Sequence, residues 1–451
     1  MTIEALPDNV LLDIFEFSLY MTWGLRWSRL VHVCQRWRYL VFASPLRLNL
    51  QLVYTSKRPV REMLDVWPPL PIYIYVDPDN VDSDNMIAAL EHRDRVRNIL
   101  IINLTSSQLE RLAAMMQEPF LALTMLQLET RETVRALPDM FLGGSTPRLE
   151  SLFLVNIPFP GLPRLLLSAT DLSQLSLLKI PDTGYISPEA MVTGLSTLTR
   201  LGYLCIQFMS SASRPYQRGQ RPPPLIRFVL PALTYMTFRG DNEYLEDFIA
   251  RIDAPRLNGL NITFFNHRLD VSQLLQFITH VGMAKSYNRA AVVFKGAYVR
   301  FAHRPPEGTA TPGRLILEIL VSCMTQICSQ YSSLLPSVEK LDIYLDSSRW
   351  QVDSDPPQWL ELFRPFTGVR TLRISCHSKS PIMCTLQDLD GEMAIEVLPA
   401  LDDLYLEDYQ PSGPEQKVIE PFIAARQYSD HPVSVHRWER PIPEGSSGYD
   451  L

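Results

Sequence analysis

The densest group of acidic side chains in the sequence consists of Asp77, Asp79, Asp82 and Asp84. Carboxylates at such spacing are the ligands that calcium-binding loops provide. A calcium loop also needs a glycine at its sixth position and an acidic residue at its twelfth, whereas those positions here hold Asp82 and Ala88. The pattern therefore favours a polar turn, in which Ser83 or Asp84 caps a helix predicted for residues 86–92.

The cysteines and histidines show no spacing typical of a metal site or a catalytic pair. The six cysteines form no CxxC pair, and the eight histidines form no HExxH motif. GxGxxG, P-loop and GxSxG motifs do not occur either. These observations disfavour an enzyme, so we expect no catalytic residue, no bound metal and no cofactor.

Bulk composition indicates a globular protein. The chain has 451 residues, 46% of them hydrophobic and 20% charged, enough for several domains or one extended repeat array. Its net charge of −7 suggests neither a nucleic-acid nor a membrane partner. No stretch has the roughly eighteen apolar residues of a membrane span, and the richest run, residues 315–328, predicts a buried helix. Without a signal peptide, we expect free thiols and a cytoplasmic and/or nuclear location.

Two amphipathic segments open the chain. In the first, Pro7 stands where a missing N–H costs nothing, and Val10, Leu11, Ile14 and Phe15 share one helix face. In the second, apolar residues recur at the three-and-four step of a helix, namely Leu30, Val33, Cys34, Trp37, Leu40 and Val41. Ser44-Pro45 ends this second pattern, because a proline disfavours a helical residue before it.

A helical segment of about 45 residues is small for an independent core. We therefore expect apolar surface that remains after internal packing to be buried against another polypeptide. The alternative is an ordinary helical cap on a larger domain.

The Leu6-Pro7 start and the Trp37 to Ser44-Pro45 pattern resemble the F-box, over about a tenth of the chain. This resemblance implies that the segment binds a Skp-type adaptor and, through it, the cullin and RING subunits of a ubiquitin ligase. The adaptor-binding residues that it implies are Leu6, Pro7, Val10, Leu11, Ile14, Leu30, Val33 and Trp37. The sequence does not separate those that face the adaptor from those in the module's own core.

A short template with apolar residues at positions one, four and six fills most of the remaining chain. Its copies are Val96/Ile99/Ile101, Leu123/Leu126/Leu128, Leu149/Leu152/Leu154, Leu175/Leu178/Ile180, Leu201/Leu204/Ile206, Leu233/Met236/Phe238, Leu257/Leu260/Ile262, Val338/Leu341/Ile343, Val369/Leu372/Ile374 and Leu401/Leu404/Leu406. A degenerate copy is expected near Val292 and Phe294. The first five copies start 27, 26, 26 and 26 residues apart, and this period is typical of leucine-rich repeats.

Positions four and six alternate, so both side chains of a short strand point to one side. The stretches between strands have helical patterns, at residues 106–117, 188–198, 244–252 and 271–281. A strand and a helix bury their apolar sides only when copies stack. The predicted fold class is therefore α/β, an all-helical N-terminal module followed by a leucine-rich-repeat solenoid with parallel strands on the concave side and helices outside. A closed α/β domain is the alternative.

Several copies follow a proline, and this sequence pattern resembles the irregular repeats of large basidiomycete F-box families. The chain departs from regular leucine-rich repeats in one respect. The asparagine expected after each strand is mostly missing, with Leu104, Arg131 and Ile157 near its place, so we expect no asparagine ladder and an uneven solenoid.

The predicted organisation has four parts. They are an F-box at 1–47, a connecting and capping layer at 48–92, the solenoid at 93–408, and a C-terminal cap with a frayed tail at 409–451. The connecting layer should contain strands at 48–53 and 72–76 around a helix near 60–66. Insertions are expected at 210–224 and 303–313. The cap should contain a helix at 416–427 and a strand at 433–437.

Side chains at positions three, five and seven of each repeat should face the concave side and bind a protein target. The chosen residues are Phe153, Lys179, Tyr203, Tyr235, Arg239, Tyr344, Arg373 and Tyr405. Alternatively, insertions cover this face, or a one-residue register error exchanges the sides.

We thus hypothesise a non-catalytic substrate receptor of a cullin–RING ubiquitin ligase. The rival hypotheses are a non-degradative scaffold and, with little support, an enzyme with a dispersed site in a closed α/β domain.

Overall fold

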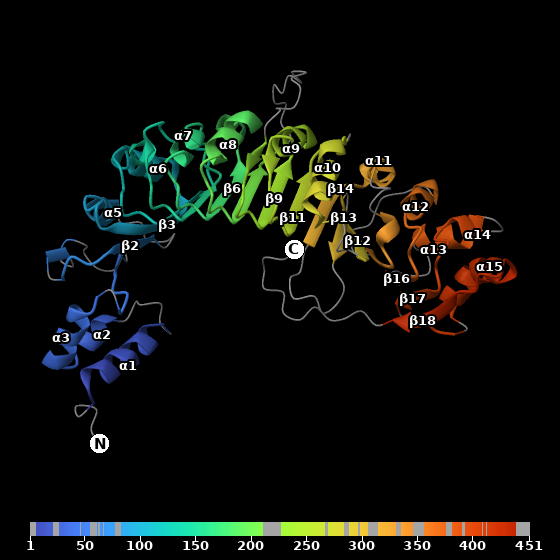
Figure 1. Cartoon of the computed structure of the whole chain (residues 1–451), viewed down its shortest axis with the longest axis horizontal. Coiled ribbons are helices and arrows are strands. Elements are labelled where there is room, and N and C mark those ends of the chain that lie inside the picture. The colour runs from blue at the N-terminus through green and yellow to red at the C-terminus, as the bar shows by residue number, and fades with distance from the viewer. Residues whose placement is uncertain are drawn as a thin grey trace. The chain divides into compact units, whose positions relative to one another are not determined.

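The computed structural model describes residues 6–20, 27–45, 47–54, 61, 64–65, 67–76, 83–210, 227–266, 269–283, 288–295, 298–304, 314–330, 335–345, 356–375, 381–389, 393–407, 409–411 and 413–438. The chain divides into two compact units, Met1–Met209 and Ser210–Leu451. Each unit is a sheet with helices, preceded in the first unit by three helices (Figure 1).

The three N-terminal helices are α1 (Asp8–Tyr20), α2 (Trp27–Val31) and α3 (Gln35–Ala43). Helix α1 begins directly after Pro7 and α3 ends before Ser44-Pro45, as predicted. The continuous helix predicted from Leu30 to Val41 is wrong, because the chain turns after Val31 and Cys34 is extended (φ −156°, ψ 172°). The turn lets Val31 and Val41 both be buried while Val33 and Cys34 face solvent.

The first unit contains seven strands among its described residues, each parallel to the next in chain order. They are β1 (Leu52–Tyr54), β2 (Ile72–Val76), β3 (Val96–Leu104), β4 (Met125–Thr130), β5 (Ser151–Val155), β6 (Gln174–Ile180) and β7 (Tyr203–Phe208). The predicted strand at 48–53 is shorter, because residues 47–49 form a turn. Of the helix predicted near 60–66, residues 61, 64 and 65 are described and helical.

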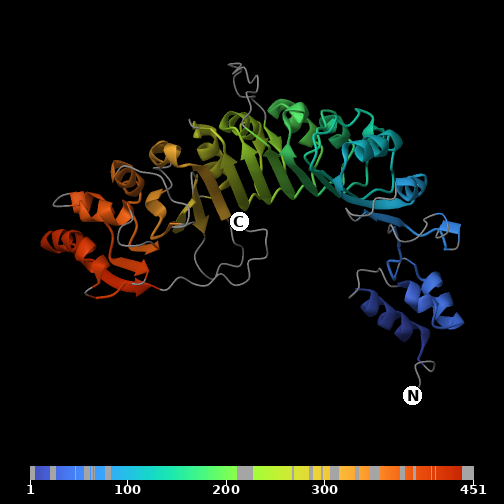
Figure 2. The ribbon, with the colours of Figure 1, turned by 180° about the vertical axis from the view of Figure 1, so that it is seen from behind.

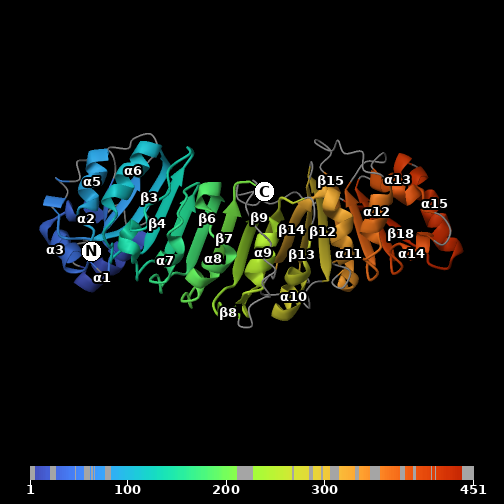
Figure 3. The ribbon, with the colours of Figure 1, turned by 90° about the horizontal axis from the view of Figure 1, so that it is seen from above.

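Helices connect these strands on one face of the sheet, and the other face carries none of them (Figures 1 and 3). They are α5 (Ser83–Leu90), α6 (Ser106–Met115), α7 (Leu162–Leu166) and α8 (Pro188–Leu195), with 3₁₀ helices η2 (Phe141–Gly144) and η3 (Asp182–Gly184). Helix α6 has a capping box in which Thr105 and Gln108 satisfy each other's backbone N–H groups.

The predicted leucine template forms the buried core, with one correction. Pairing aligns Leu152 with Leu175 and Leu154 with Leu177. The fourth copy is therefore Leu172/Leu175/Leu177, and the predicted copy Leu175/Leu178/Ile180 is displaced by three residues. Two registers are compatible with a segment so rich in leucine, and pairing with β5 selects between them.

Polar side chains link the turns after three consecutive strands. The Thr130 hydroxyl donates to the Leu104 carbonyl at 2.8 Å, and Asn156 Nδ2 donates to the Thr130 and Glu132 carbonyls at 3.3 and 2.9 Å. The expectation of no asparagine ladder is therefore wrong only for Asn156, because the link from the turn after β4 is made by a threonine. Asn156 was overlooked because it stands one residue before the position considered, in the left-handed conformation (φ 59°) that asparagine tolerates.

The second unit has strands β8 (Phe228–Val229), β9 (Tyr235–Gly240), β10 (Ile252–Asp253), β11 (Gly259–Phe264), β12 (Arg289–Lys295), β13 (Tyr298–Arg304), β14 (Arg314–Leu320), β15 (Lys340–Leu345), β16 (Thr371–Ser375), β17 (Asp403–Glu407) and β18 (Ser434–Trp438). Its helices are α9 (Asn242–Ile249), α10 (Ser272–Val281), α11 (Met324–Gln330), α12 (Pro356–Phe363), α13 (Pro381–Gln387), α14 (Met393–Glu396) and α15 (Pro414–Tyr428), with 3₁₀ helices η5 (Val321–Cys323) and η7 (Leu335–Ser337). They lie on one face of its sheet (Figure 2).

The order of the central strands departs from a simple repeat. The sheet runs β9-β11-β14-β13-β12-β15-β16-β17-β18. β13 is antiparallel to both β12 and β14, so these three strands form a meander inserted in reverse order between β11 and β15. The strand expected near Val292 and Phe294 is β12, but the expectation of parallel strands throughout is wrong.

Two predictions on this meander are corrected. Residues 315–328 are not one helix but β14, η5 and α11. A continuous apolar run also fits a strand with both faces covered, and here Leu315 and Ile316, on opposite faces, are both buried. His303, placed in an insertion, lies buried in β13; most of the predicted insertions, 211–224 and 305–313, fall outside the described residues.

The C-terminal helix and strand, predicted at 416–427 and 433–437, are α15 and β18, and β18 pairs with β17. The tail predicted to be frayed, 441–451, lies outside the described residues. Arg426 of α15 is 1% exposed. Its guanidinium donates to the backbone carbonyls of Ala394, Leu398, Pro399, Leu401 and His431, and so connects α15 to the segment that precedes β17.

We predict that Arg426→Met lowers the free energy of unfolding of the second unit by roughly 3 kcal/mol, because the five carbonyls lose a charged donor. Arg426→Lys should restore only part, since an ammonium lacks the planar fork. Urea unfolding measures the effect, with the exposed Arg364→Met as control. Equal stability of the Met variant and the control would contradict this role.

His303 generates a pH prediction. Burial lowers its pKa from 6.5 to about 4, so between these values the unfolded chain binds a proton that the folded chain excludes. Stability should be intact above pH 6.5 and fall by roughly 3 kcal/mol toward pH 4. The change of the urea midpoint between pH 7 and pH 4.5 should be smaller for His303→Gln than for wild type. The control His431→Gln, which replaces an exposed histidine, should behave as wild type. Parallel pH profiles for all three would refute the assignment.

Candidate protein-interaction surfaces

Helix α1 has apolar side chains on two sides. Leu11, Phe15 and Leu19, spaced by four residues, are at most 3% exposed and form the core of the helical module. Ile14 and Phe17 are 42% and 69% exposed, and with the half-buried Val10 they form a second stripe, which we call the outer stripe. The first stripe explains why the module folds, and the second is apolar surface that its own core does not use.

Contacts with α3 hold the N-terminal end of α1. The rings of Phe15 and Trp37 are 4.6 Å apart. Arg36 Nη2 lies 2.6 Å from both Asp8 Oδ1 and the Leu6 carbonyl oxygen. Arg36 is half-buried, and through these contacts it anchors the Leu6-Pro7 segment to α3.

An aromatic cluster joins the helices to the first strands. Trp27 is buried, and its indole N–H donates to the Gln51 carbonyl at 2.7 Å, next to β1. The Trp67 ring, just before β2, lies 5.0 Å from Trp27 and 6.0 Å from Phe42. These contacts fit the predicted role of the residues around β1 and β2 as a connecting layer.

The predicted adaptor-binding residues divide by exposure. Pro7, Ile14 and Val33 are exposed, whereas Leu6, Val10, Leu30 and Trp37 are half-buried. Leu11 is fully buried in the helical core, so its assignment to an interface does not fit the structure. The even spacing of apolar residues hides this division, because it does not tell on which side of α1 the partner helix packs.

Two exposed aromatic residues were missed by sequence reasoning. Phe17 extends the outer stripe of α1, and Tyr39 on α3 is 73% exposed. Tyr39 lines a hollow of about 450 Å³ with Gln35, Arg38, Phe42 and Ala43. Phe17 stands seven residues after Val10, a helical step that could have revealed it.

Seven of the eight predicted target-binding residues lie on the helix-free faces of the sheets. Phe153 and Tyr203 belong to the first unit, and Tyr235, Arg239, Tyr344, Arg373 and Tyr405 to the second. The aromatic residues among them are half-buried rather than fully exposed. Lys179 is wrong for this face, because it follows the displaced template copy and stands at the strand end with φ 52°.

The position of the Tyr235 ring explains why the neighbouring strand β11 begins with a glycine. A Cβ atom on Gly259 would lie 2.1 Å from the Tyr235 ring, so this ring covers β11 closely. Tyr235 is therefore held against the sheet by its neighbour.

Four strands of the second unit present a charged and aromatic cluster on the helix-free face. Asp342, Arg373, Tyr405 and His436 stand in one row across β15 to β18. Asp342, only 2% exposed, lies 2.8 Å from Arg289 and 4.0 Å from Arg373. The Arg373 guanidinium carbon lies 5.3 Å from the Tyr405 ring and 6.0 Å from the Trp438 ring, a cation–π arrangement.

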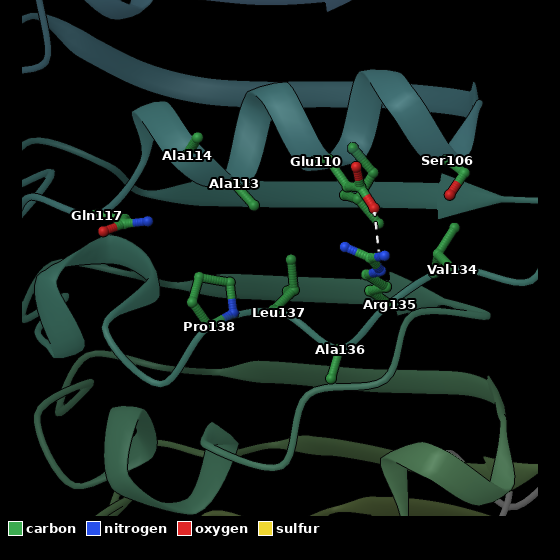
Figure 4. Close-up of a pocket in the computed structure, with 11 residues that line it drawn as sticks. Ser106, Glu110, Ala113, Ala114, Gln117, Val134, Arg135, Ala136, Leu137 and Pro138 are labelled. Carbon is green, nitrogen blue, oxygen red and sulfur yellow. Dashed lines mark ion pairs between the residues drawn. The ribbon is translucent and has the colours of Figure 1, made fainter.

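A groove on the helical side of the first unit is a weaker candidate for a binding site than this cluster. It has a volume of about 290 Å³ and lies between α6 and residues 134–138, with Leu109, Ala113 and Leu137 among its lining residues (Figure 4). The ion pair of Glu110 with Arg135, at 3.5 Å, is largely exposed, and such pairs contribute little.

In the described part of the chain, no helix is long and apolar enough to cross a membrane. No group of three or more metal-ligating side chains occurs among the same residues.

Comparison with known proteins finds no matching family model and no matching curated protein. Among solved structures, the chain is similar to the crystal structure of the leucine-rich repeat-containing protein LegL7 from Legionella pneumophila. The match covers 82% of this chain and 97% of that chain, at 12% identity and a TM-score of 0.26. A likeness of this degree identifies neither a family nor a function.

The division of α1 into two stripes predicts unequal losses of stability for two similar truncations. Leu11→Ala should cost about 2–5 kcal/mol because it opens a cavity in the helical core, whereas Ile14→Ala should cost under about 1 kcal/mol. Urea unfolding followed by tryptophan fluorescence measures both. Similar losses for the two variants would mean that the outer stripe is also part of the core.

Proposed function

We propose that this protein is a non-catalytic substrate receptor of a cullin–RING ubiquitin ligase. Its N-terminal helices would bind a Skp-type adaptor, and the helix-free sheet faces would bind a protein target. In this role the chain needs no cofactor, and ubiquitin transfer is carried out by partner proteins. Such a receptor works in the cytoplasm and/or the nucleus.

The observation that carries the proposal is the outer stripe of α1. The module buries Leu11, Phe15 and Leu19 for its own stability, and Ile14 and Phe17 remain accessible to a partner. Covering the exposed parts of these two side chains would contribute roughly 2–4 kcal/mol to binding. Val33, in the turn between α2 and α3, is 58% exposed and adds apolar surface.

The strand-and-helix repeat supports the second half of the proposal. Stacked repeats leave an extended sheet face without helices, which suits binding of a protein rather than of a small substrate. The aromatic and arginine side chains found there are those that dominate protein interfaces.

We predict that Ile14→Asp combined with Phe17→Asp abolishes co-purification with a Skp-type adaptor and leaves the free energy of unfolding within about 1 kcal/mol of wild type, because both side chains are exposed. The control Leu121→Asp places a charge at another exposed apolar residue (59%) of the same unit and should bind normally. Affinity capture of the full chain with the purified adaptor measures this.

Failure of the wild type to bind the adaptor would refute the proposal. If the adaptor binds, a reconstituted reaction with cullin, RING and conjugating enzyme tests whether captured proteins are ubiquitinated. Absence of ubiquitination would instead favour the scaffold.

A further inference from the structure

We infer that the helix-free face of the second unit binds an extended, acidic segment of a partner protein. This inference rests on the proposed function and specifies the chemistry of the target. It concerns strands β9 and β11 to β18, all within the second unit.

Charge on this face is predominantly positive. Six basic residues have described side chains there, namely Arg239, Arg289, Arg300, Arg314, Lys340 and Arg373, against four acidic residues, Glu318, Asp342, Asp403 and Glu407. The whole chain, in contrast, has a net charge of −7. A positive face on an acidic protein favours an acidic partner.

Each of the four carboxylates already has a partner on the same face. Arg300 pairs with Glu318 at 2.8 Å, and Arg289 with Asp342 at 2.8 Å. His436 lies 3.0 Å from Asp403, and the Ser375 hydroxyl donates to Glu407. The face therefore has no unpaired acidic group, among its described residues, that would repel an anionic ligand.

Two half-buried guanidinium groups are not matched in this way. Arg373 is 4.0 Å from Asp342, whose nearer partner is Arg289, and its buried Nε–H has no acceptor among the described residues. Its guanidinium carbon lies 5.3 Å from the Tyr405 ring and 6.0 Å from the Trp438 ring. Arg314 of β14 is half-buried, and its buried Nε–H also finds no acceptor. Half-buried donors without acceptors gain most from an anionic ligand.

A buried apolar cluster lies on this face between the two arginines. It consists of Ala291, Ala302 and Ile316, on β12, β13 and β14, and the partly buried Tyr344 of β15 packs against it. Tyr344 is therefore the apolar group that a ligand spanning the two arginines would meet. Arg314 and Arg373 are four strands apart, which corresponds to about 19 Å at the usual strand spacing. An extended chain covers this span in about six residues. The segment that fits therefore has two carboxylates about six residues apart, with an apolar residue between them.

The test uses the full chain and a fluorescein-labelled decapeptide with two aspartates six residues apart and a leucine between them. Fluorescence anisotropy at low salt should show binding that weakens as salt rises. Replacing both aspartates by asparagine should remove the binding. Arg373→Gln and Arg314→Gln should each weaken it about tenfold, the effect of one charge-assisted hydrogen bond.

Two control variants keep the result interpretable. Arg364→Gln removes an exposed arginine directly after α12, away from this face, and should bind as wild type. Arg373→Lys keeps the charge, so it should bind more tightly than Arg373→Gln but less tightly than wild type. Unfolding midpoints of all variants exclude loss of the fold.

Equal binding of the aspartate and asparagine peptides, or equal losses for Arg373→Gln and Arg364→Gln, would overturn the inference. Two other results would also overturn it. One is a dimer of this chain that dissociates when Arg373 is replaced by glutamine. The other is binding of a single-stranded oligonucleotide that is tighter than binding of the peptide and is lost in Arg373→Gln. Adaptor binding is measured separately, so failure here leaves the first half of the proposed function standing.

Discussion

The structure depends on one constraint: the apolar side of each strand and helix can be buried only by the next strand and helix. Ile99, Leu126, Leu152, Leu175 and Leu204 stand in one row across consecutive strands, and each is at most 1% exposed. No single layer could exclude water from its own leucine. Stability therefore accumulates by stacking, and the face opposite the helices remains outside this core.

Where the repetition stops, other interactions replace it. At the N-terminal end, the aromatic cluster of Trp27, Phe42 and Trp67 joins the helices to β1 and β2. At the C-terminal end, Arg426 of α15 donates to five backbone carbonyls, four of them in the segment before β17. Both arrangements use large side chains with polar ends, which can fill space and satisfy backbone groups at the same time.

The same division between core and free surface occurs twice, on different scales. In α1, one stripe holds the module together and a second remains accessible. In the sheet of the second unit, one face packs under helices and the other presents Arg373, Tyr405 and Trp438. The meander of β12 to β14 matters for this second surface, because it inserts Arg300, Arg314 and their apolar neighbours between strands of the regular repeat.

Local signals in the sequence determined where elements begin, end and recur. Pro7 and Ser44-Pro45 delimit the N-terminal helices because a proline restricts its own backbone and that of its neighbour. The leucine spacing reveals the strands because a strand with one covered face needs alternation. Tertiary structure decided what such spacing leaves open. Pairing with β5 chose Leu175 and Leu177 over Leu178 and Ile180, and cover on both faces made residues 314–320 a strand. Packing of α3 made Leu11 core and left Ile14 exposed. In each case the local pattern is compatible with two arrangements, and only contacts with residues far along the chain distinguish them.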